Sequence, residues 1–198
     1  METDIKPKLS LILDNTSLGW LVALGIYDFS TWKHSRRVAE IASSLAQQRE
    51  VEDEVTEHIW YGALLHDIGK IYIPQKILQK PDTLSEQEWK LMRRHPIFAY
   101  NLLTTNESLV IIKNIAYCHH EKWDGTGYPR GLTADEIPLA ARIFAVVDVW
   151  DALHSDRPYR RAWPVDKVRA YIDEESGSYF DPKIAASFLN MDMASVHI

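Results

Sequence analysis

Two pairs of adjacent metal-binding side chains constrain this chain more than any other feature of its sequence. His66 is followed directly by Asp67, and His119 is followed directly by His120. Neutral imidazole and carboxylate are ligands that borderline divalent metals prefer. One carboxylate can bridge two metals through its two oxygens, while neighbouring imidazoles each bind one of them. Because two metals about 3.5–4 Å apart can hold the attacking and leaving oxygens of a phosphodiester, the pattern predicts a two-metal phosphohydrolase.

The hydrophobic periodicity predicts an all-α fold in a single domain. Val38, Ala42 and Leu45 recur at helical spacing, and Thr31 is the expected N-cap of their helix. A capping box predicts another helix from Ser85 to about residue 94. The other helices that we expect cover residues 53–66, 107–120, 138–153 and 165–175, with short ones from Pro96 and Pro182.

No segment predicts a transmembrane span or a leader. The longest apolar stretch, residues 18–26, is shorter than the about 20 residues that a bilayer requires. Residues 1–4 are acidic, whereas a signal sequence begins with a basic segment. The single cysteine, Cys118, excludes an internal disulfide, which suits a reducing compartment. We therefore expect a cytoplasmic protein, in which Cys118 is a buried thiol rather than a metal ligand.

The acidic net charge limits the partners that this chain can bind. The sequence has 28 Asp and Glu against 22 Lys and Arg residues, a formal net charge of −6. That charge argues against a broad DNA- or RNA-binding surface. A small phosphorylated ligand needs only a local basic cluster, and residues 157–161 are one candidate.

Further side chains join the two pairs as candidate ligands. His34 lies four residues before Val38, which places it on the inward face of its predicted helix. Each pair ends a predicted helix, the first before Gly69 and the second before a glycine-rich loop. Asp148 lies within an apolar run, where an unpaired charge would be costly. Taken singly, each histidine is more often a core or surface residue, but the combination, with His95, favours a metal centre.

The remaining polar residues have simpler interpretations. Asp151 follows Asp148 by three residues, and a capping or hydrogen-bonding role near the end of its helix is the better reading. His58, His154 and His197 have no companions of this kind, so we interpret them as structural or surface residues.

The order and spacing of these motifs resemble the HD-GYP domain, a branch of the HD phosphohydrolase superfamily. The similarity covers about residues 30–190. The matching segments are residues 34–38, 66–71, 80–84, 95–96, 119–121, 124–129, 137–143, 148–153 and 157–160. We therefore expect residues 1–29 to be an N-terminal helix or linker remnant, residues 30–190 the catalytic domain and residues 191–198 a frayed tail.

The resemblance implies a helical bundle with a buried metal centre that hydrolyses cyclic di-GMP to linear pGpG, and in some members onward to GMP. Carried over by position, Asp67 would bridge two metals. The ligands of the first would be His34, His66, Asp67 and Asp148, and those of the second Asp67, His95, His119 and His120.

The resemblance also assigns catalytic and substrate-binding roles. Asp67 and Lys70 would be the catalytic residues, with Lys70 near the scissile phosphate. Tyr128 would contact the substrate from the signature loop, and Arg157 and Arg160 would contact its phosphates. A packing role that shapes the loop remains the alternative for Tyr128, and we interpret Arg161 as a solvated surface residue.

Two positions depart from the family pattern. Members with three metals carry a glutamate four residues before the first histidine, where this chain has Ser30. Because serine lacks a carboxylate, we expect a binuclear site, which weakens the case for the second hydrolysis to GMP. Ala99 stands where the His-Pro motif usually ends in glycine, and this change should not remove a ligand.

The implied cofactors are two divalent metal ions, iron or manganese first, with zinc or nickel as alternatives. The oxygen-rich ligand shell of magnesium-only sites is absent from the ligand set. A hydroxide that bridges the two metals would attack phosphorus, while Lys70 and Arg157 offset the charge that develops on the phosphoryl oxygens.

The leading hypothesis is therefore an active cyclic di-GMP phosphodiesterase of a bacterial cytoplasm. One alternative is a phosphohydrolase for another cyclic dinucleotide or for a nucleotide. A second is a non-catalytic module that binds cyclic di-GMP, or a diguanylate-cyclase domain, through the loop at residues 125–129. We expect no membrane, DNA or RNA partner, and the sequence leaves open whether the chain forms a homodimer.

Overall fold

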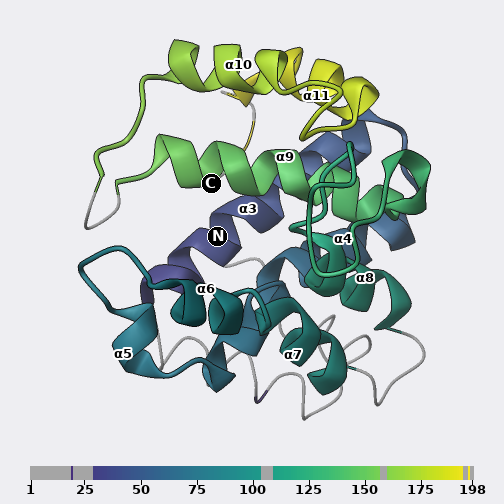
Figure 1. The fold of residues 1–198 in the computed structure, drawn as a ribbon. Helices are drawn as coiled ribbons and strands as arrows, with labels where there is room; N and C mark the ends of the chain where they lie inside the picture. The colour runs from purple at the N-terminus through teal and green to yellow at the C-terminus, as the bar shows by residue number, and fades with distance from the viewer. Residues whose placement is uncertain (1–18, 20–28, 104–108, 157–159, 194–195, 197–198) are drawn as a thin grey trace.

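A computed structural model describes residues 19, 29–103, 109–156, 160–193 and 196, and it confirms the all-α fold (Figure 1). These residues form α-helices and short 3-10 helices, joined by loops with isolated β-bridges. The elements, in chain order, are α3 (Phe29–Gln48), α4 (Asp53–Leu65), η1 (Ile68–Tyr72), α5 (Gln75–Leu78), α6 (Glu86–Met92), α7 (His95–Leu102), α8 (Val110–Cys118), η3 (Ala134–Glu136), α9 (Leu139–His154), α10 (Val165–Glu174) and α11 (Pro182–Leu189).

The core lies between helices that are distant in sequence. Helix α3 packs against α4 and α9, α4 packs against α8, and α7 packs against η1 and α8. Helices α10 and α11 lie together over α9, on the side away from α6 and α7 (Figure 1). Helix α9 is central, because residues along most of its length are buried, Phe144 and Val147 completely. Burial of this apolar surface is the main stabilising contribution to the bundle.

The capping signals predicted from the sequence are present at several helix ends. The Ser85 side chain accepts a hydrogen bond from the backbone N–H of Glu88, whose carboxylate accepts one from the Ser85 N–H in return. Pro96 lies in the first turn of α7, as expected. The predicted N-cap at Thr31 is wrong, because α3 already begins at Phe29. Residue 31 therefore belongs to the helix rather than preceding it.

The two ends of the chain differ in how far the structure describes them. The expected helix or linker at residues 1–29 lies almost entirely outside the described residues. At the other end, we expected a frayed tail over residues 191–198. Within that segment, the side chains of Met191 and Val196 are buried in the core. Among the described residues, no helix has both the length and the apolar character that a bilayer crossing requires.

Candidate metal centre

Asp67 lies at the centre of the predicted site, between the end of α4 and the start of η1. Its Oδ2 is 3.1 Å from Nε2 of His66 and 2.5 Å from Nζ of Lys70. Its Oδ1 is 3.3 Å from Nε2 of His95 and 3.9 Å from Nε2 of His119. The two oxygens of this one buried carboxylate therefore face different groups of side chains.

Burial and charge act in opposite directions on Asp67. Burial alone would raise its pKa, but His66, Lys70 and His95 hold the pKa of this carboxyl well below its ordinary value. The side chain is therefore an anion at neutral pH, in a place from which water is largely excluded. Such a buried charge is stable only with cations or hydrogen-bond donors around it.

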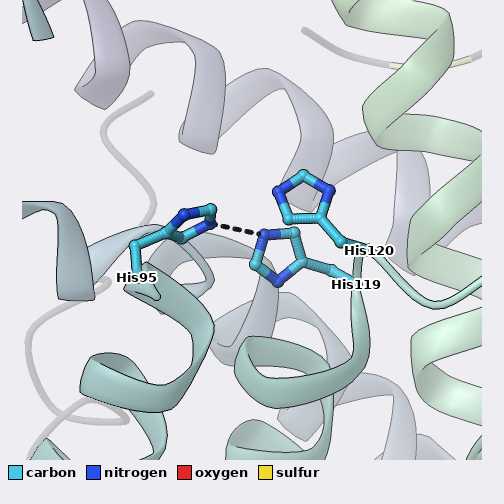
Figure 2. A group of neighbouring side chains, drawn as sticks. All are labelled: His95, His119 and His120. Carbon is cyan, nitrogen blue, oxygen red and sulfur yellow. Dashed lines mark hydrogen bonds between the residues drawn. The ribbon is translucent and has the colours of Figure 1, made fainter. Parts of the chain in front are cut away.

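Two groups of potential ligand atoms meet at this carboxylate, which belongs to the first group and faces the second. Within each group, the ligand atoms lie within 4.8 Å of one another. One group is His34, His66 and Asp67, and the other is His95, His119 and His120. Figure 2 shows the second group, in which the three imidazoles point toward a common centre from α7 and from the end of α8. Asp148 adjoins the first group, with Oδ1 3.1 Å from Nε2 of His34. The structure thus brings together all seven residues that were predicted as ligands.

Helix ends and one glycine bring these side chains together. His66 and His119 are the C-cap residues of α4 and α8, and His95 is the first residue of α7. A Cβ atom at Gly69 would lie 2.0 Å from the His95 carbonyl oxygen and 2.6 Å from the Ala99 nitrogen. Only glycine therefore allows η1 to approach the first turn of α7. Ala99 is fully buried at this contact, and His95 keeps its place beside Asp67.

Backbone carbonyls orient two of the three histidines of the second group. Nδ1 of His95 is 2.8 Å from the Met92 oxygen, and Nδ1 of His119 is 3.0 Å from the Ala116 oxygen. A carbonyl can only accept, so Nδ1 carries the proton in both rings and Nε2 has the free lone pair. The two Nε2 atoms lie 3.2 Å apart (Figure 2). Two lone pairs at this distance repel each other unless a cation lies between them.

The protonation states of this group also suit a metal. Burial lowers the pKa of His95 to about 4 and that of His120 to about 3, and it holds the pKa of His119 well below its ordinary value. All three imidazoles are therefore neutral at pH 7. Neutral imidazole is the form that binds zinc, iron, manganese or nickel. The donor set and its lone-pair directions fit a divalent metal ion.

A carboxylate, rather than a carbonyl, orients His34. Its Nδ1 lies 2.6 Å from Oδ2 of Asp151, and its Nε2 faces Asp148. Arg37 donates to both oxygens of Asp151, at 2.8 and 2.9 Å. Burial disfavours the charged imidazole, but Asp148 and Asp151 outweigh it and raise the pKa of His34 to about 9. The sequence indicated a hydrogen-bonding role for Asp151, but it did not indicate His34 as the partner.

The signature loop after α8 lies against the second group. The ring of Tyr128 stacks on that of His120, with centres 4.7 Å apart and planes 28° apart. A Cβ at Gly127 would lie 2.3 Å from the Lys122 nitrogen, so the loop can close only with glycine there. The buried Glu121 carboxylate accepts hydrogen bonds from the N–H groups of Arg130 and Leu132, at 2.7 and 3.0 Å. Sequence reasoning assigned no role to Glu121, whose buried charge holds this loop in place.

The basic residues predicted to contact phosphate differ in what the structure shows of their surroundings. Lys70 contacts Asp67 directly and is partly exposed. Arg157 lies outside the described residues, as does the side chain of Ser30, whose backbone belongs to α3. The Arg160 guanidinium donates to the carbonyls of Leu153 and Ala152 at the end of α9. Its predicted contact with substrate phosphate therefore stays a prediction.

Comparison with known proteins identifies the family of this chain and several of its relatives. Residues 24–184 match the HD domain family. The chain is 42% identical, over 84% of its length and 45% of the relative, to the cyclic di-GMP phosphodiesterase response regulator RpfG of Xanthomonas campestris. It is 41% identical, over 78% of its length and 34% of the relative, to the 3′3′-cGAMP-specific phosphodiesterase 3 of Vibrio cholerae. It thus spans less than half of either relative.

A solved structure has the same fold. An HDG"Y"P protein from Bdellovibrio bacteriovorus superposes with a TM-score of 0.64 at 22% identity, over 81% of this chain and 51% of that one. At this level of identity, the likeness extends to the fold alone.

Proposed function

Because this chain belongs to the HD domain family, in its HD-GYP branch, we propose that it is a metal-dependent phosphodiesterase that hydrolyses cyclic di-GMP to linear pGpG. The observation that carries this proposal is the buried Asp67 carboxylate, whose two oxygens face two separate groups of histidines. A shared carboxylate between two nitrogen-rich groups is the ligand arrangement of a two-metal site. Cyclic di-GMP is the substrate in the name of a relative that is 42% identical.

We assign two divalent metals to this centre. One would be bound by His34, His66, Asp67 and Asp148, and the other by Asp67, His95, His119 and His120. When bound, such metals supply Lewis-acid activation of water and of a phosphoryl oxygen. Nitrogen-rich ligand sets favour iron, manganese, zinc or nickel over magnesium.

The side chains around the centre have separate tasks. Lys70 keeps its ammonium group at the edge of the site, where it can offset negative charge on the phosphate in the transition state. Tyr128 covers one face of His120 and limits the access of water to that ligand. Asp67 holds the two ligand groups together, so its replacement should affect both.

We expect the first product, pGpG, to accumulate. Ser30 stands where a third metal would need a carboxylate, so the second hydrolysis to GMP should be slow. A third metal per chain, or rapid formation of GMP, would contradict this expectation.

A second candidate substrate is 3′3′-cGAMP. The observation in its favour is the 41% identity with a relative whose name specifies that dinucleotide. Both dinucleotides carry the same phosphodiester linkage, so the metal centre alone does not distinguish them. A non-catalytic binding module is less well supported, because such a module has no need of a complete set of buried ligands.

The decisive experiment combines metal content with product formation. Protein purified without oxygen would be analysed for metals per chain and then incubated with cyclic di-GMP, 3′3′-cGAMP and pGpG. We expect about two metals per chain and accumulation of pGpG. Metal-loaded protein that leaves every dinucleotide intact with iron, manganese, zinc and nickel would refute the proposed activity.

Variants at a histidine within α4 and at the histidine that caps its end provide a matched control. His66→Ala removes an imidazole that faces Asp67, and it should abolish turnover and reduce the metal content. His58→Ala removes an imidazole whose Nδ1 contacts the Glu54 carbonyl within its own helix, and it should leave turnover and metal content unchanged. Equal activity in the two variants would remove His66 from the site.

A further inference from the structure

Arg93 lies one aromatic ring away from the candidate metal centre. It caps the C-terminus of α6, two residues before His95. Its Cζ atom lies 5.3 Å from the ring centre of Tyr128 and 6.0 Å from that of Trp89. Tyr128 in turn stacks on His120. The ring of Tyr128 is therefore in contact with the guanidinium as well as with a candidate metal ligand.

The positive charge of Arg93 is not balanced by the acids of its own helix. Glu86 pairs with Lys90 at 2.9 Å, and Glu88 pairs with Lys80 at 2.6 Å. Among the described residues, no carboxylate forms an ion pair with Arg93, which is exposed. Aromatic rings therefore hold this cation in place, and they contact a guanidinium without using its N–H groups.

Two of the other basic side chains assigned to the site already have partners in the part of the chain that the structure describes. Lys70 pairs with Asp67, and Arg160 donates to carbonyls at the end of α9. Within the described part of the chain, no hydrogen bond or ion pair engages the Arg93 guanidinium, whose planar fork of donors matches the oxygens of a phosphate bidentately. In a chain with a net charge of −6, an exposed cation beside the site adds to the local positive potential that a doubly charged ligand requires.

We infer that Arg93 binds the phosphodiester of a cyclic dinucleotide that is not being cleaved. This inference rests on the proposed function. A cyclic dinucleotide has two phosphodiester groups, and only one of them can lie at the metal centre at a time. The other needs a cation nearby, and Arg93 supplies it beside Tyr128. Arg93 is thus a substrate-positioning residue that the sequence motifs did not identify.

The test is direct binding of a phosphorothioate analogue of cyclic di-GMP to metal-loaded protein, measured by calorimetry. Arg93→Ala should weaken binding by about tenfold or more, the loss expected for one charge-assisted contact. Arg93→Lys keeps the positive charge but loses the planar guanidinium, so its affinity for the analogue should lie between those of the wild-type protein and Arg93→Ala. Metal content per chain should be the same in all three proteins.

Arg94 supplies the matched control. It is the adjacent residue, it is exposed, and its Cζ lies 5.0 Å from the ring centre of Phe98 rather than over Tyr128. Arg94→Ala should change the affinity by less than about twofold, as for a surface charge remote from the ligand. Equal losses in the two alanine variants would show a general charge effect and overturn the inference.

The phosphorothioate analogues of 3′3′-cGAMP and cyclic di-AMP separate phosphate contact from base contact. Arg93→Ala should lose the same factor with each analogue that wild-type protein binds, because the phosphate is common to all. A loss confined to guanine-containing analogues would show base recognition and overturn the inference. Wild-type affinity in Arg93→Ala would overturn it while leaving the proposed function intact. Wild-type protein that binds no analogue would overturn both.

Discussion

Four histidines of the candidate metal centre are oriented in two different ways. Three of them, the helix-end histidines His66, His95 and His119, donate Nδ1–H to the carbonyl three residues earlier. His34 instead lies inside α3, and its Nδ1 contacts Asp151, a residue 117 positions away. The first arrangement is local to each chain segment, whereas the second exists only once α3 has packed against α9.

This difference has consequences for charge. A carbonyl adds no net charge, so burial dominates and the helix-end histidine His95 has its pKa lowered to about 4. The carboxylates beside His34 raise the pKa of that ring to about 9. In the absence of metal, the imidazoles of the second group are therefore neutral at pH 7. The His34 imidazole is instead charged and lies between two acids. A carboxylate partner also makes a ligating imidazole more basic, which tightens its bond to a metal.

Asp67 is the residue that both arrangements share, and its replacement should have the largest effect. Asp67→Asn removes the negative charge between the two groups of ligands. We expect activity to fall by about 10²–10³-fold or more, comparable to the loss of one transition-state stabiliser. The occupancy of both metal sites should also fall. Steady-state turnover and metal analysis would measure this. Asp82→Asn, at an exposed acid outside the site, should retain wild-type values; retained metal content in Asp67→Asn would contradict the bridging role.

The pH dependence of stability in metal-free protein tests the charge difference. The pKa of His34 is raised to about 9, so its contribution is fully present below the ordinary value of 6.5 and is lost as the pH rises to about 9. The pKa values of His95 and His120 are lowered to about 4 and 3, so the unfolded chain takes up more protons and stability falls below pH 6.5.

Metal-free protein should therefore be most stable near pH 6.5, with a loss of about 3 kcal/mol on the alkaline side from His34. Urea unfolding after chelator treatment would measure the free energy of unfolding at several pH values. His34→Gln should remove the alkaline decline and keep the acid one. A stability that changes in one direction only between pH 4 and pH 9 would show that the two kinds of histidine do not differ as described.

Replacement of Asp151 should have a smaller effect, which is confined to the metal site that contains His34. Asp151→Asn keeps the shape of the side chain but removes the charge that orients His34. We expect the metal on the His34 side to bind about 10–100-fold more weakly, while the other metal is retained. Competition with a chelator would resolve the two affinities, and Asp151→Glu should restore part of the loss. Equal weakening of both metals would mean that Asp151 supports the fold rather than this ligand.

Ser85 should give the smallest effect, because it lies outside both arrangements. Ser85→Ala removes the cap of α6 and should lower the free energy of unfolding by about 1 kcal/mol. Metal content and turnover should stay unchanged. Thermal unfolding alongside a metal assay would show whether α6 acts only as a support for the segment that carries Arg93.

Much of this site can be predicted from the sequence, because much of it is local. Helical spacing, the capping box at Ser85 and the proline of α7 define helices whose ends carry His66, His95 and His119. A histidine at a helix end has the carbonyl three residues earlier within reach, so its orientation follows from its position in the chain. The ligand types and the family could also be predicted, because the motifs that carry them are short local segments of the sequence.

Only the tertiary structure decided which distant groups meet. The partner of His34, the approach of η1 to α7 at Gly69 and the position of Arg93 over Tyr128 all join separate elements. The hydrogen bond from the Arg160 guanidinium to the Leu153 carbonyl of α9 likewise could not be deduced from the motif that contains Arg160. Periodicity and capping act over a few residues, so they determine helices and their ends. The pairing of charges across the bundle depends on how those helices pack, which no local pattern specifies.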